Sequence, residues 1–314
     1  MAEMVKKATR ESFGETVTAL AAEYPEIVVL DADLAAATKT GIFKKAYPER
    51  FFDCGIAECN MVGVAAGLAT CGKIPFAASF AMFSAGRAFE QVRNSVGYPK
   101  LNVKIVGSHA GISVGEDGAT HQCCEDIALM RTIPGMVILN PCDHYEMQAA
   151  VRAAVEHKGP CYIRLGRLAV ESINNNDDYK FELGKGITLR EGTDITVVAT
   201  GLMVQEAVKA ADALKEEGIS VEVINIHTIK PLDEELVNAS AKKTGRVITV
   251  EEHNIIGGLG EAVSTALSEH CPTPVTRIGV NDVYGHSGPA VDLLKEFGLS
   301  AEHIAEVIRE KLAK

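Results

Sequence analysis

Two patterns of apolar residues alternate along the chain. Short runs rich in β-branched residues are continuously apolar, and between them lie longer stretches with apolar residues at helical spacing. A continuously apolar run is typical of a parallel strand that is covered on both faces. The pattern therefore predicts strands at Ile27–Leu30, Val103–Val106, Val137–Leu139, Tyr162–Leu165, Ile195–Ala199, Val221–Ile226, Val247–Glu251 and Val275–Val280.

The intervening stretches read as helices. Val204–Gly218 has apolar residues at helical spacing and ends in glycine, a common C-terminal stop. Another helix is expected to begin at Asp233, just after "KPL". Strands that alternate with helices predict an α/β fold of open, mostly parallel sheets with helices on both sides.

One segment breaks this alternation. The stretch "SINNNDDYKFELGKG", Ser172–Gly186, is rich in Asn and Asp and short of apolar residues, as expected for an interdomain linker. We therefore predict a first domain at 1–172, a linker at 173–187 and a second domain at 188–314.

Composition and charge narrow the class of protein. The 314 residues are 47% hydrophobic and 23% charged, as in soluble globular proteins. The net charge of −11 argues against a nucleic-acid or anionic-membrane partner. No apolar run approaches the ~18 residues of a membrane span, and "MAEMVKKATRESFG" has no apolar core of a secretory signal. We expect a cytoplasmic protein whose eight cysteines, none in a C-x-x-C pair, are reduced and bind no metal.

Glu58 is out of place in its surroundings. From Ile56 to Cys71 the only other polar side chains are Asn60 and Thr70. A helix here would place apolar or small groups around the carboxylate on every face. Because burying a charge without a partner is costly, we expect Glu58 to meet a partner from elsewhere.

A glycine-rich segment carries most of the candidate chemistry. "GSHAGISVGEDGATHQCCED", Gly107–Asp126, follows a predicted strand and precedes a helix expected near Cys123. Loops at the carboxyl ends of parallel strands are where α/β proteins bind ligands. His109, Asp117 and His121 on this loop are therefore candidate functional residues.

Two further segments allow two interpretations each. Phe80, Phe83 and Phe89 in "ASFAMFSAGRAFEQVR" are either core aromatics of a helix or a flat platform for a ring. "GGLGEA", Gly257–Ala262, is either an anion-binding turn at a helix start or a structural turn.

Five motifs in order resemble the transketolase family. They are "GIAECNM", "SFAMF", "GSHAGISVGEDGATHQ", "CYIRLGR" and "TIKPLDEELV". They span the chain, which resembles the last half of a transketolase, its pyrimidine-binding domain and its C-terminal domain. The resemblance implies a transferase of carbohydrate metabolism, as in the pentose phosphate pathway, that moves a two-carbon ketol unit from a ketose phosphate to an aldose phosphate.

The same resemblance implies a partner. The family binds thiamine diphosphate and magnesium through a diphosphate domain with a G-D-G motif and a later Asn. "GEDG", Gly115–Gly118, with Asn140 does not qualify, because Glu116 replaces the required glycine, the spacing is short and Pro141 follows. We therefore expect the C-terminal subunit of a split enzyme, whose N-terminal partner subunit holds the magnesium and the diphosphate. The family's dimers suggest an α2β2 assembly.

Site roles carry over by position within the resemblance. Glu58 matches the glutamate that hydrogen-bonds N1′ of the aminopyrimidine ring, Phe80 and Phe83 match residues that flank the ring, and Asp33 in "DADLAAAT" matches an aspartate that lines the cofactor site.

Substrate roles carry over in the same way. His109, Asp117 and His121 resemble residues that contact sugar hydroxyls, and both histidines are candidates for proton transfer, given histidine's ordinary pKa near 6.5. Arg10 and Arg167 match arginines that bind the sugar phosphate. Where the family often has Ser beside this phosphate, the chain has Ala37, followed by Thr38 as a possible replacement.

Three alternatives remain open at this point. The 1-deoxyxylulose-5-phosphate synthases share a similar loop but lack a histidine at His109. The 2-oxo acid dehydrogenase β subunits also pair with a chain that holds the diphosphate, yet they differ in the "GEDGATHQ" loop. A non-catalytic subunit that only stabilises its partner is the third.

Overall fold

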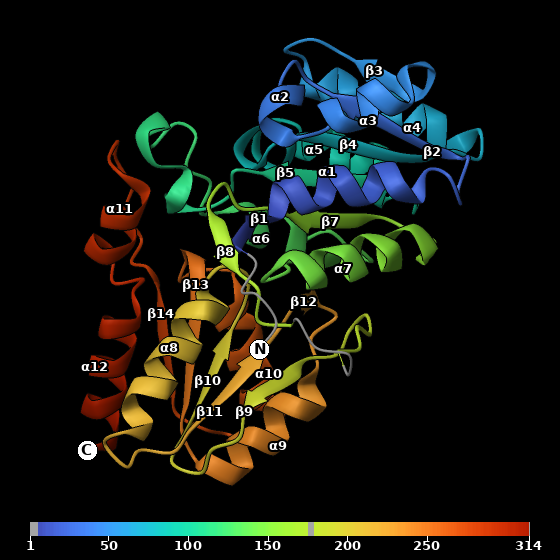
Figure 1. Cartoon of the computed structure of the whole chain (residues 1–314). Coiled ribbons are helices and arrows are strands. Elements are labelled where there is room, and N and C mark those ends of the chain that lie inside the picture. The colour runs from blue at the N-terminus through green and yellow to red at the C-terminus, as the bar shows by residue number, and fades with distance from the viewer. Residues whose placement is uncertain (1–5, 175–178, 314) are drawn as a thin grey trace.

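The computed structural model describes residues 6–174 and 179–313. It contains two large sheets, one above the other in Figure 1, with helices on both faces of each. This confirms the predicted α/β class with mostly parallel sheets. No helix in the described part of the chain is both long and apolar enough to cross a membrane.

The upper sheet has seven strands in the order β12-β6-β7-β5-β4-β2-β3. All its pairs are parallel except β12 with β6. The strands are β2 (Ile27–Asp31), β3 (Phe51–Asp53), β4 (Ile74–Phe80), β5 (Lys104–Ser108), β6 (Val137–Leu139), β7 (Cys161–Arg164) and β12 (Thr228–Lys230).

The lower sheet has five strands in the order β14-β13-β10-β11-β9, parallel except for β9 with β11. A two-stranded antiparallel ribbon pairs β1 (Lys6–Ala8) with β8 (Ala169–Glu171). The lower strands are β9 (Ile187–Arg190), β10 (Ile195–Ala199), β11 (Val221–Asn225), β13 (Val247–Asn254) and β14 (Val275–Val280).

Helices cover both faces because successive strand residues point to opposite sides. The side chains of Ile27 and Val29 in β2 belong to one apolar core cluster, and those of Val28 and Leu30 belong to another. The helices are α1 (Thr9–Leu20), α2 (Ala35–Thr38), α3 (Gly41–Ala46), α4 (Glu58–Thr70), α5 (Phe89–Gln91), α6 (Asp126–Arg131), α7 (His144–Glu156), α8 (Met203–Lys215), α9 (Glu234–Thr244), α10 (Leu259–His270), α11 (Ala290–Glu296) and α12 (Ala301–Leu312); η1 (Pro48–Arg50) and η4 (Ile112–Asp117) are 3-10 turns, and η2 (Met82–Arg87) and η3 (Val92–Gly97) are π-helical.

The predicted strands all occur, with ends shifted by at most a few residues. The expectation that Asp233 starts a helix is also correct, since its side chain caps α9 by accepting from Leu236 N. The helix expected near Cys123 begins later, at Asp126. The central strand β4 was missed, because its small residues in "IPFAASF" lack a β-branched run; Phe80 therefore ends a strand rather than lying in a helix.

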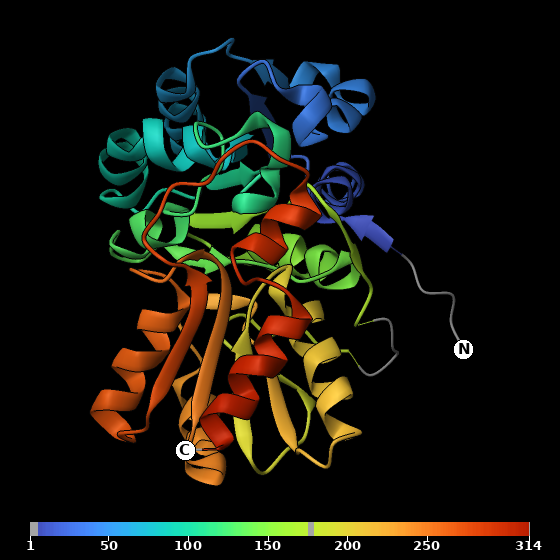
Figure 2. The same ribbon diagram turned by 90° about the vertical axis from the view of Figure 1, so that its left-hand side faces the viewer.

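The two halves are joined through more than the chain between them. Strand β12 follows the predicted linker but extends the upper sheet. Ile173 and Asn174 of that linker both donate backbone N–H groups to Asp143 Oδ2 at 2.7 Å, while residues 175–178 lie outside the described part. Figure 2 shows the segment before α11 rising from the lower half to the upper one. The proposed boundaries at 172 and 188 stay a prediction.

Candidate functional site

Four parallel strands end at the same edge of the upper sheet. Asp31 ends β2, Phe80 ends β4, Ser108 ends β5 and Arg164 ends β7, and these strands are neighbours in the sheet. The carboxyl edge of an open α/β sheet is the usual ligand site. The predicted functional loop and aromatics therefore belong to one region.

Glu58 is buried, as its surroundings predict. It is the first residue of α4 and only 1% exposed. Its Oε2 accepts a hydrogen bond from Arg87 Nη1 at 2.8 Å. Arg87 ends η2, half exposed, and its guanidinium lies 4.7 Å from the centre of the Phe83 ring. The partner of the buried carboxylate is thus an arginine that the sequence analysis did not select.

Two phenylalanines and two histidines form a cluster of rings next to this pair. The Phe80 and Phe83 rings are nearly parallel, 6.0 Å apart. His109 stacks on Phe80 with ring centres 4.0 Å apart, and His121 meets Phe83 edge-on at 5.3 Å. The structure therefore brings both loop histidines to the two phenylalanine rings, while Phe80 itself is buried, and the platform interpretation stays a prediction.

His109 is held as a neutral imidazole. Arg10 Nη1 lies 3.2 Å from Nε2, and since a guanidinium only donates, Nε2 must accept. The proton is then on Nδ1, which donates to Ser108 Oγ at 2.9 Å. Burial, then the charges of Arg10 and Arg167, lower the pKa of His109 to about 3. The ordinary pKa assumed for His109 therefore does not hold in this environment, and its part in proton transfer stays a prediction.

Of the two candidate phosphate arginines, Arg10 contacts His109, and the charge of Arg167 also acts on it. Arg10 also donates to Ala37 O at 2.9 Å, and burial lowers its pKa. Among the described residues no group accepts from its buried Nε. Arg167 donates to Val114 O and, at 2.6 Å, to Glu116, whose pKa it helps to lower. Arg10 thus has a buried Nε–H without an acceptor among the described residues.

Thr38 does not replace the hydroxyl that Ala37 lacks. Its side chain is fully buried and donates to Asp31 Oδ2 at 2.7 Å, and Thr40 donates to the same oxygen at 2.8 Å. Burial raises the pKa of Asp31, and these hydroxyls oppose the rise. Asp33 is exposed at this edge, with φ of 62° and its N–H on Asp53 Oδ1.

The second half of the chain supports the loop that carries Asp117 and His121. Asp117 itself is exposed at the end of η4. Gln122 Nε2 donates to His286 O at 2.9 Å. Gly118 has φ of 76°, and a Cβ there would lie 2.5 Å from Ser287 Oγ, so only glycine allows this close approach.

A buried ion pair lies beneath the loop. Arg164 Nε donates to Asp126 Oδ2 at 2.8 Å, and Tyr162 donates to the same oxygen at 2.7 Å. Arg164 also donates to Glu252 O of the second half at 2.8 Å. Burial opposes ionisation of Asp126, yet Arg164 leaves its pKa below the usual value.

The turn "GGLGEA" binds the chain's own carboxylate. Leu259 N and Gly260 N, at the start of α10, donate to the two oxygens of buried Glu251 at 2.6 and 2.7 Å. Burial raises the pKa of Glu251 to about 7. The anion expected at this helix start is therefore supplied internally, which favours the structural interpretation.

Cysteines and acidic residues form no evident metal site. All eight cysteines are free thiols, and Cys71 is exposed. In residues 6–174 and 179–313, no group of three or more His, Cys, Asp or Glu side chains is arranged to hold a metal ion.

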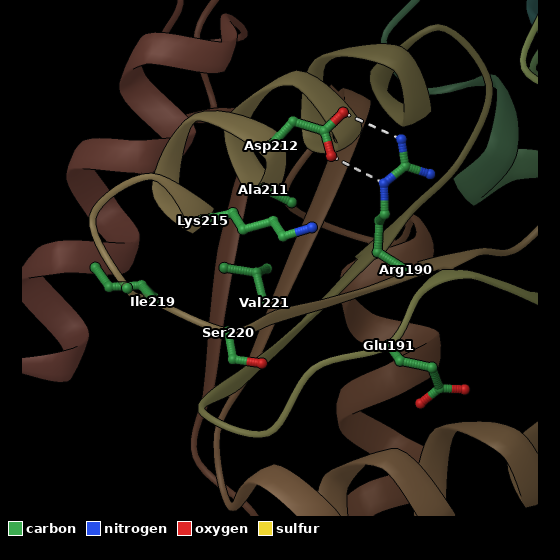
Figure 3. A pocket seen from close by; sticks show the side chains of 9 residues that line it. Arg190, Glu191, Ala211, Asp212, Lys215, Ile219, Ser220 and Val221 are labelled. Atoms are coloured by element: carbon green, nitrogen blue, oxygen red, sulfur yellow. Dashed lines mark hydrogen bonds and ion pairs between the residues drawn. The ribbon is translucent and has the colours of Figure 1, made fainter.

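A hollow of about 310 Å³ lies far from these residues, beside β9 and α8 (Figure 3). Arg190 spans its rim and donates to both oxygens of Asp212, at 2.9 and 3.1 Å. Its arginine is already paired with Asp212, and Lys215 also lines the hollow.

Several residues of the site could not be selected from the sequence, because their contacts join segments that are far apart in the chain. Arg87, Gln122 and Glu252 were not selected, because their partners lie 29, 164 and 139 residues away. Arg87 alone had a local signal, since it follows Phe83 by four residues, a spacing that places side chains on one helix face.

Comparison with known proteins gives the same family for both halves. Residues 5–172 match the family described as "Transketolase, pyrimidine binding domain", and residues 184–304 match "Transketolase, C-terminal domain". A solved structure described as "Split gene transketolase, inactive beta4 tetramer" is similar at a TM-score of 0.91 and 51% identity, over 98% of this chain and 99% of that one.

Three relatives match this chain over nearly their whole length, and two of them are named for different sugars. A "Putative transketolase C-terminal section" of Methanocaldococcus jannaschii is 52% identical over 99% of this chain and 98% of its own. The "6-deoxy-6-sulfo-D-fructose transketolase subunit SqwH" of a Clostridium species is 46% identical, covering 96% and 93%. A subunit of an apulose-4-phosphate transketolase from Phocaeicola vulgatus is 41% identical, covering 98% of both chains.

Proposed function

Because the chain belongs to the transketolase family and matches its C-terminal half, we propose that it is the C-terminal subunit of a split, thiamine diphosphate-dependent transketolase. It transfers a two-carbon ketol unit from a ketose phosphate to an aldose phosphate. The observation that carries the proposal is the buried carboxylate of Glu58 beside the parallel rings of Phe80 and Phe83.

The side chains around Glu58 suit an aminopyrimidine ring. A buried carboxyl group can hydrogen-bond a ring nitrogen, and aromatic faces favour a flat heterocycle. Glu58 and Phe83 already bind one flat, hydrogen-bonding group, the guanidinium of Arg87. When bound, thiamine diphosphate supplies the carbon nucleophile for carbon–carbon cleavage, whereas the protein orients it and holds one proton at Glu58. Phe80 and Phe83 flank the ring, and Asp33 lines the site.

The proposed substrate residues include both histidines of the ring cluster. His109 is neutral, so it binds sugar hydroxyls without carrying charge, whereas His121 remains the candidate for proton transfer. Arg10 and Arg167 bind the phosphate, and the contact of Arg10 with His109 supports its place beside the sugar. Asp117 is exposed at the same loop and binds a further hydroxyl.

The residues of the site define the identity of the sugar substrate less closely than they define the other parts of this proposal. Ala37 has no hydroxyl for the phosphate, and Thr38 is committed to Asp31. Two of the relatives are named for 6-deoxy-6-sulfo-D-fructose and for apulose-4-phosphate. We propose a sugar phosphate as substrate on the strength of the two arginines.

We propose that an N-terminal partner subunit holds the diphosphate and magnesium. The names "C-terminal section", "subunit" and "split gene" among the relatives support a partner. Exposed Phe52, Ile56 and Val64 belong to β3, α4 and the segment between them, within six residues of Glu58 in the sequence, and such apolar groups suit a subunit contact. An α2β2 assembly in the cytoplasm, without nucleic acid or membrane, completes the proposal.

The test is reconstitution with a candidate partner. Ketol transfer is measured with thiamine diphosphate and magnesium for the wild-type chain, Glu58→Gln and the exposed control Glu90→Gln. We expect Glu58→Gln to lower kcat at least about 100-fold, the range for a lost proton contact, with assembly intact. Full activity of Glu58→Gln would indicate a subunit that only stabilises its partner, and transfer by this chain alone would exclude a split enzyme.

A further inference from the structure

Arg87 makes the two contacts that the aminopyrimidine ring is proposed to make. Its Nη1 donates to Glu58 Oε2 at 2.8 Å, and its planar guanidinium lies 4.7 Å from the centre of the Phe83 ring. A guanidinium and an aminopyrimidine are both flat and both hydrogen-bond. One carboxylate and one ring face cannot serve both groups in the same positions.

We propose that Arg87 is a placeholder, which occupies the place of the aminopyrimidine ring in the cofactor-free chain and leaves Glu58 when the ring binds. This inference rests on the proposed function, because it needs the ring to bind at Glu58. It adds a residue that controls how readily the site accepts its cofactor.

The two members of the ion pair are unequal in a way that permits this exchange. The Glu58 side chain is 2% exposed, whereas that of Arg87 is 51% exposed. Water can therefore solvate Arg87 as soon as it turns away, but it cannot solvate Glu58. A buried carboxylate needs a replacement partner, and the ring nitrogen provides one.

The exchange reduces the apparent affinity for the ring. When only a fraction of the chains has Arg87 turned away, the apparent dissociation constant rises by the inverse of that fraction. If the paired form exceeds the open form by ten to one, Arg87→Met tightens binding about tenfold. A residue with a purely structural role would weaken binding or leave it unchanged when it is replaced.

The experiment titrates 4-amino-5-hydroxymethyl-2-methylpyrimidine into the full chain and follows the heat of binding. The wild type is compared with Arg87→Met, Arg87→Lys and Glu58→Gln. Arg93→Met is the matched control, because Arg93 is an exposed arginine of the next helical segment that donates to Asn94. We expect Arg87→Met to bind about tenfold more tightly, Arg87→Lys to gain less, Arg93→Met to match the wild type and Glu58→Gln to bind more weakly.

The outcomes separate the two proposals. If the wild type binds in a manner that depends on Glu58 but neither Arg87 variant binds more tightly, the placeholder is wrong and the cofactor site stands. If no variant binds, or if Glu58→Gln binds as the wild type does, the ring does not use Glu58 and both proposals fail. Urea unfolding checks each variant, and Arg87→Lys decides if Arg87→Met does not fold.

Discussion

Glu252 Oε1 accepts a hydrogen bond from the backbone N–H of Ser113 at 2.7 Å, across 139 residues of chain. Glu252 is buried in strand β13 of the lower sheet, and Ser113 lies on the loop that carries Asp117 and His121, two of the proposed substrate residues. Gly111 approaches so closely, at φ of 85°, that a Cβ there would lie 2.3 Å from the same oxygen. The second half of the chain thus fixes the base of the loop.

Replacing this carboxylate should loosen the loop. Glu252→Ala leaves the buried Ser113 N–H without an acceptor, which costs about 1–3 kcal/mol of unfolding free energy. Glu252→Gln keeps an amide oxygen and is the matched control. Urea denaturation gives the stabilities, and hydrogen exchange at Ser113 should speed up in the alanine variant alone. Equal exchange rates in the two variants would show that the bond does not hold the loop.

The acid sensitivity of the fold should depend in part on His109. Its pKa is about 3 in the folded protein and 6.5 ordinarily, so the unfolded chain binds the extra proton. The neutral state of His109 therefore lowers the unfolding free energy only below pH 6.5, where the unfolded chain takes up the proton, and this loss grows as the pH falls towards 3.

We therefore expect His109→Gln to have a shallower loss of unfolding free energy between pH 6 and 4, by up to about 1.4 kcal/mol per pH unit. Chemical denaturation at several pH values measures the slope. Parallel slopes for the wild type and the variant would contradict a neutral buried His109.

Two Asp–Arg ion pairs should differ in how much unfolding free energy is lost when they are broken, because one is buried and the other is exposed. Asp126 and Arg164 are almost fully buried, so Asp126→Asn leaves an unpaired buried guanidinium and should cost about 3–5 kcal/mol. Asp212 and Arg190 make a similar but exposed pair (Figure 3), and Asp212→Asn should cost less than about 1 kcal/mol. Unfolding free energies of the two variants test this, and comparable costs would refute it.

A hydrogen bond between Tyr179 of the predicted linker and Glu146 leads to a prediction about pH dependence. Tyr179 Oη donates to buried Glu146 at 2.9 Å, and Asn225 Nδ2 donates to the same oxygen at 2.7 Å. Burial raises the pKa of Glu146 to about 7, so the carboxyl is neutral well below pH 7 and ionised well above it in the folded protein.

Hydrogen bonds to a charged acceptor are stronger than those to a neutral one. Tyr179→Phe should therefore cost about 1 kcal/mol at pH 5 and about 2–3 kcal/mol at pH 9. Thermal or urea unfolding at the two pH values provides the measurement. A cost that is constant with pH would mean that Glu146 does not titrate in this range.

Local pattern was sufficient for much of the architecture. The β-branched run Ile195–Ala199 indicated its strand because all five of its residues are buried between covering helices. Val275–Val280 was also predicted, although its first three residues, at the sheet edge, are not buried. Glu58, the ring residues and the glycine-rich loop were also selected from their neighbours in sequence. Family motifs then indicated what each residue type is suited to do.

Partners and ionisation states required the tertiary structure. The sequence showed that Glu58 needs a partner, but only the turn of η2 against α4 brings Arg87 to it. It showed a histidine at 109, but only the stacking on Phe80 and the approach of Arg10 make that histidine neutral. Composition and spacing report what each residue is, whereas hydrogen bonds and desolvation depend on which distant residues share its space.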